Sequence, residues 1–88
     1  MAYRVLLGRR AEKNYEAAPK AEQQRLKQGL LALEDDPAAP RAGAEIKRLK
    51  GPSGLYRIRI GAWRAIYGID GRDVIITDIF RKKRGYDV

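Results

Sequence analysis

The residues of this sequence best suited to chemistry are three arginines in the stretch 55–67, LYRIRIGAWRAIY. The alternation of apolar and charged residues on either side of Gly-Ala at 61–62 predicts two strands joined by a two-residue type II′ turn. That turn pairs Arg59 with Arg64 and places Arg57 on the same face of the hairpin. The sequence therefore predicts a sheet face that gathers guanidinium groups.

A cluster of guanidinium groups is suited to holding phosphate, because each offers a planar fork of donors and a charge that does not titrate away. Arg59 and Arg64 lie directly opposite each other in the predicted pairing, so they repel unless an anion sits between them. The alternative interpretation is a strand face that is simply solvated.

The other face of the predicted hairpin is apolar and is expected to pack on helices. It carries Tyr56, Ile58, Ile60, Trp63, Ala65 and Tyr67. We interpret the aromatic residues of this set as packing residues and not as platforms for stacked bases.

Composition restricts the possible chemistry. The 88 residues include no Cys and no His, so thiolate or imidazole metal sites and every His-based triad are excluded. Acid–base chemistry must come from Tyr, Lys, Arg or a carboxylate, and we expect no metal and no cofactor. No apolar stretch approaches the roughly 20 residues of a membrane helix, and no signal peptide is evident, so we expect a soluble cytoplasmic protein.

The charge of the chain is strongly positive and uneven. The formal net charge is +8. Residues 1–44 hold eight Lys and Arg against six Asp and Glu, whereas residues 45–88 hold eleven against five. The positive field therefore belongs to the half that contains the arginine hairpin, which suits a polyanionic partner such as nucleic acid.

Apolar periodicity and turn residues divide the chain into alternating elements. The expected elements are a strand at 3–7, helices at 9–17 and 20–35 joined at Pro19, a strand at 45–50, the arginine hairpin, a type I′ turn at Asp70-Gly71, and a central strand at 74–80. This order predicts an α+β fold in which a helical hairpin packs on one face of a mostly antiparallel sheet. The arginine face is then left open to solvent or ligand.

The motifs and their order resemble the RelE/ParE toxins of bacterial toxin–antitoxin pairs. The resemblance rests on Leu49-Lys50-Gly51, residues 56–61 (YRIRIG), residues 63–67 (WRAIY) and the basic tail 81–86, and it covers nearly the whole chain as one domain, 1–88. It implies a RelE-like fold, a RelB-like antitoxin as protein partner, and one of two activities. RelE-like members cleave mRNA on the ribosome, whereas ParE-like members poison DNA gyrase.

The RelE-like branch implies a metal-independent endoribonuclease, with the ribosome and mRNA as further partners. Carried over by position, its catalytic residues are Arg57, Arg59, Arg64, Arg81 and Tyr86. The first two positions are Lys in the best-known RelE pattern, and Arg will not readily release a proton. Tyr86 is therefore the candidate base and Arg81 the candidate acid, although any of residues 81–84 can fill that basic position.

Further basic residues are candidates for contacts with RNA phosphates. They are Lys47, Lys50, Lys82, Lys83 and Arg84. A nucleic-acid-binding module without catalysis also accounts for the charge, but it leaves the toxin-like order of motifs unexplained.

Overall fold

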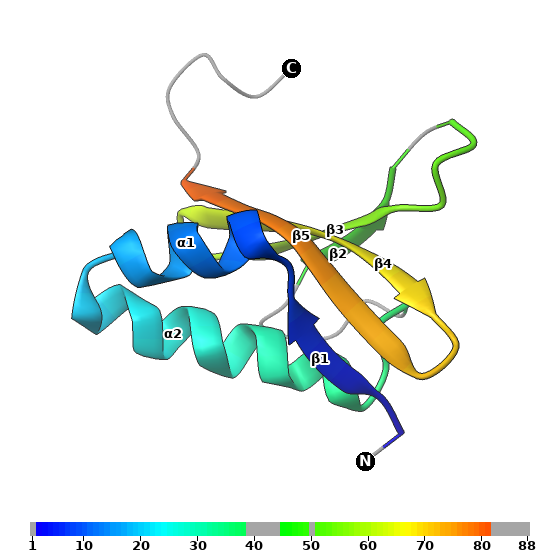
Figure 1. Cartoon of the computed structure of the whole chain (residues 1–88), viewed down its shortest axis with the longest axis horizontal. Coiled ribbons are helices and arrows are strands. Elements are labelled where there is room, and N and C mark those ends of the chain that lie inside the picture. The colour runs from blue at the N-terminus through cyan, green and yellow to red at the C-terminus, as the bar shows by residue number, and fades with distance from the viewer. Residues whose placement is uncertain (1, 39–44, 50, 82–88) are drawn as a thin grey trace.

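A computed structural model describes residues 2–38, 45–49 and 51–81 of the chain (Figure 1). In chain order the elements are β1 (Arg4–Leu7), α1 (Arg9–Ala17), α2 (Lys20–Leu31), the 3-10 turn η1 (Ala32–Glu34), β2 (Glu45–Arg48), β3 (Tyr56–Ile60), β4 (Trp63–Asp70) and β5 (Asp73–Arg81). Within this described part, no helix has the length and apolar character needed to cross a membrane.

The strands that the structure describes form one mixed sheet in the order β1-β5-β4-β3-β2. β1 runs parallel to β5, and the other neighbours are antiparallel. The expected α+β architecture is confirmed, and β5 is an interior strand along the part that β1 covers. Beyond β1, the outer edge of β5 is covered by α1, whose Asn14 donates from Nδ2 to the Ile79 carbonyl at 2.9 Å.

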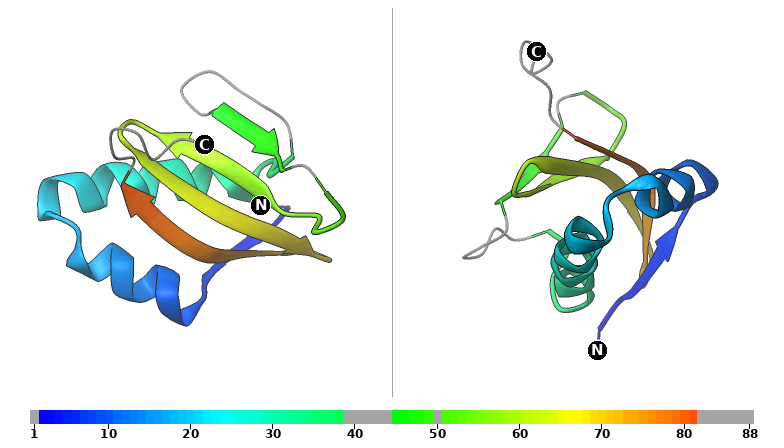
Figure 2. Two further views of the ribbon diagram at one scale, coloured as in Figure 1. Left: turned by 90° about the horizontal axis from the view of Figure 1, so that it is seen from above. Right: turned by 90° about the vertical axis from the view of Figure 1, so that its left-hand side faces the viewer.

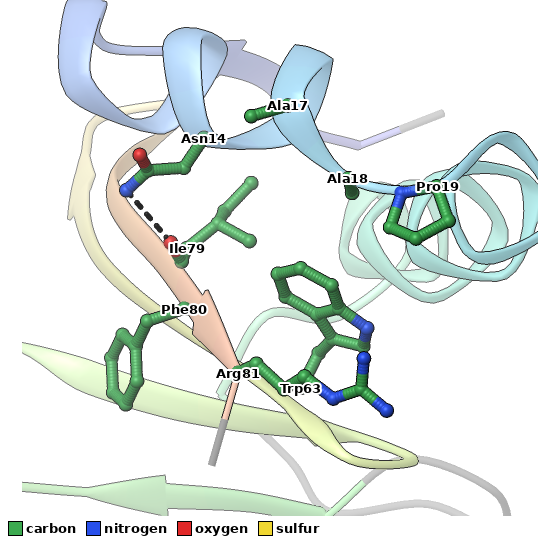
Figure 3. A pocket seen from close by; sticks show the side chains of 8 residues that line it. All are labelled: Asn14, Ala17, Ala18, Pro19, Trp63, Ile79, Phe80 and Arg81. Carbon is green, nitrogen blue, oxygen red and sulfur yellow. Dashed lines mark hydrogen bonds between the residues drawn. The ribbon is translucent and has the colours of Figure 1, made fainter. Parts of the chain in front are cut away.

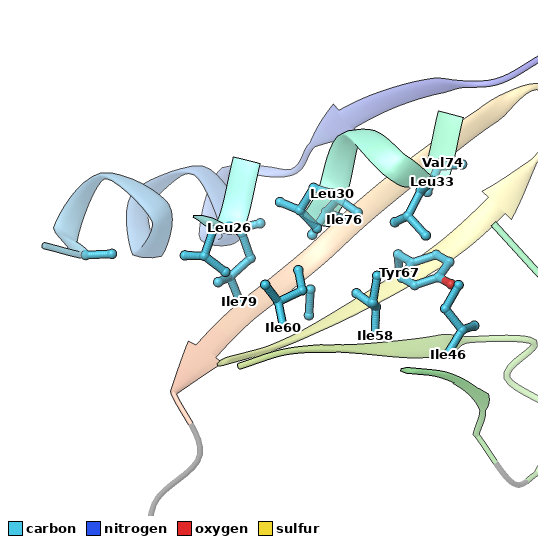
Figure 4. Close-up of a cluster of buried hydrophobic side chains, with 13 residues drawn as sticks. Leu26, Leu30, Leu33, Ile46, Ile58, Ile60, Tyr67, Val74, Ile76 and Ile79 are labelled. Atoms are coloured by element: carbon cyan, nitrogen blue, oxygen red, sulfur yellow. The ribbon is translucent and has the colours of Figure 1, made fainter. Parts of the chain in front are cut away.

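Both helices cover the same face of the sheet, as the end view in Figure 2 shows. The core lies between the two layers and is formed by Leu26, Leu30 and Leu33 from the helical side and by isoleucines and Tyr67 from the strands (Figure 4). The Tyr67 ring is fully buried, and its hydroxyl donates to the Pro37 carbonyl at 2.6 Å. The predicted apolar face of the hairpin is therefore the core face.

The helical hairpin bends at Ala18 and Pro19, as the sequence predicts. Proline cannot donate a backbone hydrogen bond, so the first helix ends before it and the second begins after it. Carbonyl groups at the end of α1 accept hydrogen bonds from Gln23 of α2, whose Nε2 lies 3.0–3.2 Å from the carbonyl oxygens of Tyr15, Glu16 and Ala18. α2 is shorter than expected, because the predicted helix over 20–35 tightens into η1 after Leu31.

The two hairpin turns have the same design. Gly61 has φ +60°, and no residue other than Gly has a positive φ within the described chain, which fits the predicted type II′ turn.

The second turn differs from its prediction. Asp70 and Asp73 are paired, so the central residues are Gly71 and Arg72, and only Gly71 has positive φ, at +62°. The type I′ prediction at Asp70-Gly71 is therefore wrong, because the glycine occupies the first central position.

A β-bulge interrupts the pairing of β4 with β5. Ile66 pairs with Asp78 while the next residue, Tyr67, pairs with Ile76, so Thr77 has no partner residue on β4. The Thr77 hydroxyl instead donates to the Ile66 carbonyl at 3.2 Å. A bulge adds one residue to a strand and so reverses which side chains face which way beyond it.

Candidate functional site

The predicted register of the arginine hairpin is confirmed. Arg59 lies opposite Arg64, and Arg57 lies opposite Ile66. Paired residues share a face of an antiparallel sheet, so all three arginines point away from the helices. We call Arg57, Arg59 and Arg64 the arginine face.

Pairing across the sheet extends this face into two rows. The rows are Glu45–Arg59–Arg64–Phe80 and Lys47–Arg57–Ile66–Asp78. The four cations outnumber the two acidic residues. The Asp78 carboxylate is also engaged elsewhere, because it accepts a hydrogen bond from Asn14 of α1 at 3.0 Å.

The three arginines differ sharply in exposure. The Arg59 side chain is 51% exposed, and its Nη1 lies 3.0 Å from Oε1 of Glu45, an exposed ion pair. Arg57 is half-buried, whereas Arg64 is only 4% exposed. The face was expected to be left open to solvent or ligand, and it is open at Arg59 but not at Arg64. Arg64 is almost fully buried, and Arg59 has its ion-pair partner in Glu45 from β2.

Two nitrogen atoms of this face are buried without a hydrogen-bond partner among the described residues: Nε of Arg57 and Nη1 of Arg64. Leaving a buried donor unsatisfied costs about 1–3 kcal/mol, and more when the group is charged. Buried donors are normally hydrogen-bonded, so these two nitrogen atoms are candidate contacts for an anionic ligand.

Arg81 does not join the arginine face. It pairs with Trp63, whose side chain points to the helix side, so Arg81 lies on the opposite surface of the sheet. Its Nη1 lies 3.5 Å from Oε1 of Glu22, and the same oxygen accepts a hydrogen bond from Nε1 of Trp63 at 2.6 Å. Arg81 and Trp63 line an open pocket of about 320 Å³ at the junction of the helices (Figure 3).

The other predicted site residues are distributed as follows. Lys47 is exposed and lies beside Arg57 on the arginine face. Tyr86, Lys50, Lys82, Lys83 and Arg84 lie outside the described residues. The structure thus brings Arg57, Arg59, Arg64 and Lys47 together, and it separates Arg81 from them.

Sequence reasoning missed the acidic and aromatic neighbours of these cations. Glu45 and Glu22 pair with Arg59 and Arg81 across strands and helices distant in sequence, and no local pattern predicts such pairs. Phe80 joins the arginine face only because of the bulge at Thr77. The sequence held one signal for the pair with Arg59. Glu45 and Lys47 are two residues apart in a predicted strand, so they share one face of it.

Comparisons with known proteins agree with this geometry. The sequence model of the ParE toxin of type II toxin–antitoxin systems matches residues 5–86. A Methanocaldococcus jannaschii protein, assigned by inference as toxin RelE1, is 33% identical over 88 residues, covering 98% of this chain and 97% of its own.

Solved structures give the same result. RelE in the archaeal RelE–RelB complex of Pyrococcus horikoshii superimposes with a TM-score of 0.80 at 30% identity, covering 96% of this chain and 99% of that one. The fold is also shared with the intact RelBE toxin–antitoxin complex of E. coli, with a TM-score of 0.73 at 23% identity, covering 94% of this chain and 100% of that one. The chain belongs to the RelE/ParE family, the toxins of type II toxin–antitoxin systems.

Proposed function

We propose that this toxin cleaves mRNA on the ribosome, as a metal-independent endoribonuclease held inactive by an antitoxin. The observation that carries the proposal is the arginine face, and above all Arg64. This residue is only 4% exposed, and its Nη1 has no hydrogen-bond partner in the described chain. A phosphate of the substrate would supply the missing acceptor.

The chemistry follows from the residue types available. The ribose 2′-oxygen attacks the adjacent phosphorus, the bond from phosphorus to the 5′-oxygen breaks, and a cyclic 2′,3′-phosphate and a 5′-hydroxyl result. Arg57, Arg59 and Arg64 stabilise the extra negative charge of the phosphorane, which is usually the largest contribution to such catalysis. We assign Tyr86 the role of the base that takes the 2′-hydroxyl proton, because a site rich in cations would favour a phenolate.

The cation that assists the leaving 5′-oxygen is best sought among residues 81–84. Arg81 is the first candidate by position, but its ion pair with Glu22 holds it beside the helices. Lys82, Lys83 or Arg84 would serve without breaking that pair, and we favour them. Lys47, Lys50 and the remaining tail cations would contact flanking phosphates.

The partners follow from the same comparisons. The RelE proteins from P. horikoshii and E. coli are seen in complexes with RelB antitoxins, which supports a RelB-like antitoxin for this toxin. An acidic segment laid over the arginine face would neutralise its charges and block RNA together. Ribosomes and mRNA place the proposed action in the cytoplasm.

Induction of the toxin followed by mapping of mRNA 5′ ends tests the cleavage. Tyr86→Phe keeps the ring and removes the hydroxyl, so it should fold normally, still bind ribosomes, and cut at least ~10²-fold more slowly, the scale expected for loss of a general base. Cleavage of programmed ribosomes at the wild-type rate by this variant would remove Tyr86 from the mechanism.

A second function has an observation in its favour, because the matching family model is that of the ParE toxin. A ParE-like gyrase poison acts by binding protein and needs no catalytic hydroxyl. In that case Tyr86→Phe would leave growth arrest and DNA-damage signalling nearly intact, and induction would produce no new mRNA 5′ ends.

A further inference from the structure

The bulge at Thr77 changes which side chains of β5 face the arginines. In β5, Val74 and Ile76 point into the core, and strict alternation would send position 80 there as well. The extra residue shifts the pattern, so Ile79 is the fully buried residue and Phe80 turns to the other face. Figure 3 shows the Phe80 ring directed away from the Trp63 indole, although Phe80 is also one of the residues that line the pocket there.

Phe80 therefore lies in the same cross-strand row as Arg64. The two residues are directly paired between β4 and β5, where side chains on one face stand about 5 Å apart at Cβ. Phe80 is half-buried, so it is not fully enclosed at this position. The sheet thus pairs an aromatic residue with a buried arginine whose Nη1 has no hydrogen-bond partner among the described residues.

We propose that Phe80 is a base-stacking residue: Arg64 holds a phosphate of single-stranded RNA and the Phe80 ring stacks on the base of an adjoining nucleotide. The inference rests on the proposed function, and it adds a second contact that recognises the base and not the backbone. Aromatic rings beside cationic grooves are the usual means of binding single strands, because every base has a face that can stack.

Electrostatics alone would not require an aromatic residue here. The rest of the row consists of Glu45, Arg59 and Arg64, so Phe80 is the aromatic member of an otherwise charged row. Bulges are frequent beside active sites, where they re-aim a side chain. Here the bulge moves residue 80 from the core face, where strict alternation would place it, to the arginine face.

The stacking is tested by fluorescence with a short RNA that contains 2-aminopurine and carries 2′-O-methyl groups, so that no 2′-hydroxyl can attack. Purified toxin should bind this RNA and quench its emission. Phe80→Leu should abolish the quenching and weaken binding by roughly 5- to 150-fold, the range for loss of one stacked base. Phe80→Tyr keeps a ring and should retain both.

Two controls separate stacking from folding and from charge. Ile75→Ala removes an apolar side chain from the distant end of the same strand and should leave the quenching unchanged. Arg64→Met should weaken binding of the RNA. In any complex that still forms, the 2-aminopurine emission should remain quenched, because Phe80 is unchanged. Emission from Trp63 and the thermal midpoint report whether each variant is folded.

The outcomes distinguish this inference from the proposed function. If wild-type toxin binds the RNA through Arg64 but Phe80→Leu binds and quenches equally well, the stacking role is wrong and the nuclease proposal stands. If wild-type toxin does not bind the RNA, the stacking role is overturned. Mapping of 5′ ends on ribosomes then decides separately whether the chain cleaves mRNA.

Discussion

At the scale of single residues, burial separates cations that look equivalent in the sequence. Arg59 is half-exposed and paired with Glu45, whereas Arg64 is almost fully buried. An exposed ion pair contributes little to stability, typically about 0–1 kcal/mol. The buried Nη1 of Arg64 has no hydrogen-bond partner among the described residues, and a buried donor left unsatisfied is destabilising.

Replacement of Arg64 by methionine should therefore separate stability from activity. Arg64→Met keeps an apolar stem in the buried site and removes the charge, so the free energy of unfolding should stay constant or rise. Cleavage on ribosomes should fall by about 10²-fold, the scale for losing one group that stabilises the transition state. Denaturant unfolding and a cleavage assay measure the two quantities.

The matched control is Arg59→Met, which removes an exposed charge from the same row. Its free energy of unfolding should change by less than about 1 kcal/mol. Marked unfolding of the Arg64 variant would instead show that this guanidinium group stabilises the fold.

Glu22 is a second residue whose importance only the structure reveals. One carboxylate oxygen accepts the Trp63 indole hydrogen bond and lies 3.5 Å from the Arg81 guanidinium group, so it ties α2 to the ends of β4 and β5. Glu22→Ala should destabilise the protein by about 1–2 kcal/mol, since the indole donor loses its partner. The emission of Trp63, the only tryptophan in the sequence, should shift as its surroundings change.

Glu16→Ala, an exposed glutamate on α1, is the control for loss of one carboxylate. It should leave the emission spectrum unchanged. Identical spectra for both variants would contradict the assigned role of Glu22.

At the scale of elements, the approach of α2 to β3 depends on Gly29. A Cβ at this position would lie 2.6 Å from Cδ1 and 3.1 Å from Cγ2 of Ile60, which is itself buried. A methyl group here would therefore require the Ile60 side chain to move. The glycine that weakens the helix locally is thus required by its packing.

Gly29→Ala should consequently destabilise the protein although alanine favours helix. Overpacking costs about 1–3 kcal/mol and the gain in helix propensity is about 1 kcal/mol, so we expect a net loss near 1 kcal/mol. The loss should shrink or reverse in an Ile60→Ala background, measured by a double-mutant cycle of unfolding free energies. Equal effects in both backgrounds would mean that Ile60 is not the obstacle.

Elements defined by local rules were predictable from the sequence. The Gly-Ala turn and the alternation around it determine the register of β3 and β4, and Pro19 determines where the helices separate. The bulge at Thr77 was not predictable, because it results from how β4 and β5 pair and not from either strand alone. As a result, the sequence correctly predicted Arg57, Arg59 and Arg64 on one face but could not predict that Arg81 and Phe80 exchange sides.

At the scale of the whole molecule, the net charge of +8 favours an acidic partner for the free toxin. A RelB-like antitoxin that covers the arginine face would relieve its repulsion and satisfy the buried donors. The complex should then melt at a markedly higher temperature than the free toxin, because a ligand that binds only the folded state stabilises it. Equal melting temperatures by calorimetry, with and without saturating antitoxin, would count against this.

The parallel pairing of β1 with β5 has a consequence for synthesis. Arg4 lies beside Asp73 and bonds to it across a separation of 69 residues, so the first strand has no neighbour until the last is made. Pairing between such distant segments makes folding slow, since a long loop must close first. A nascent chain that has not reached β5 lacks both the partner of β1 and the row that contains Phe80. The pairing of β1 therefore depends on a strand that is synthesised last among those the structure describes, so the complete sheet can form only after β5 has been made.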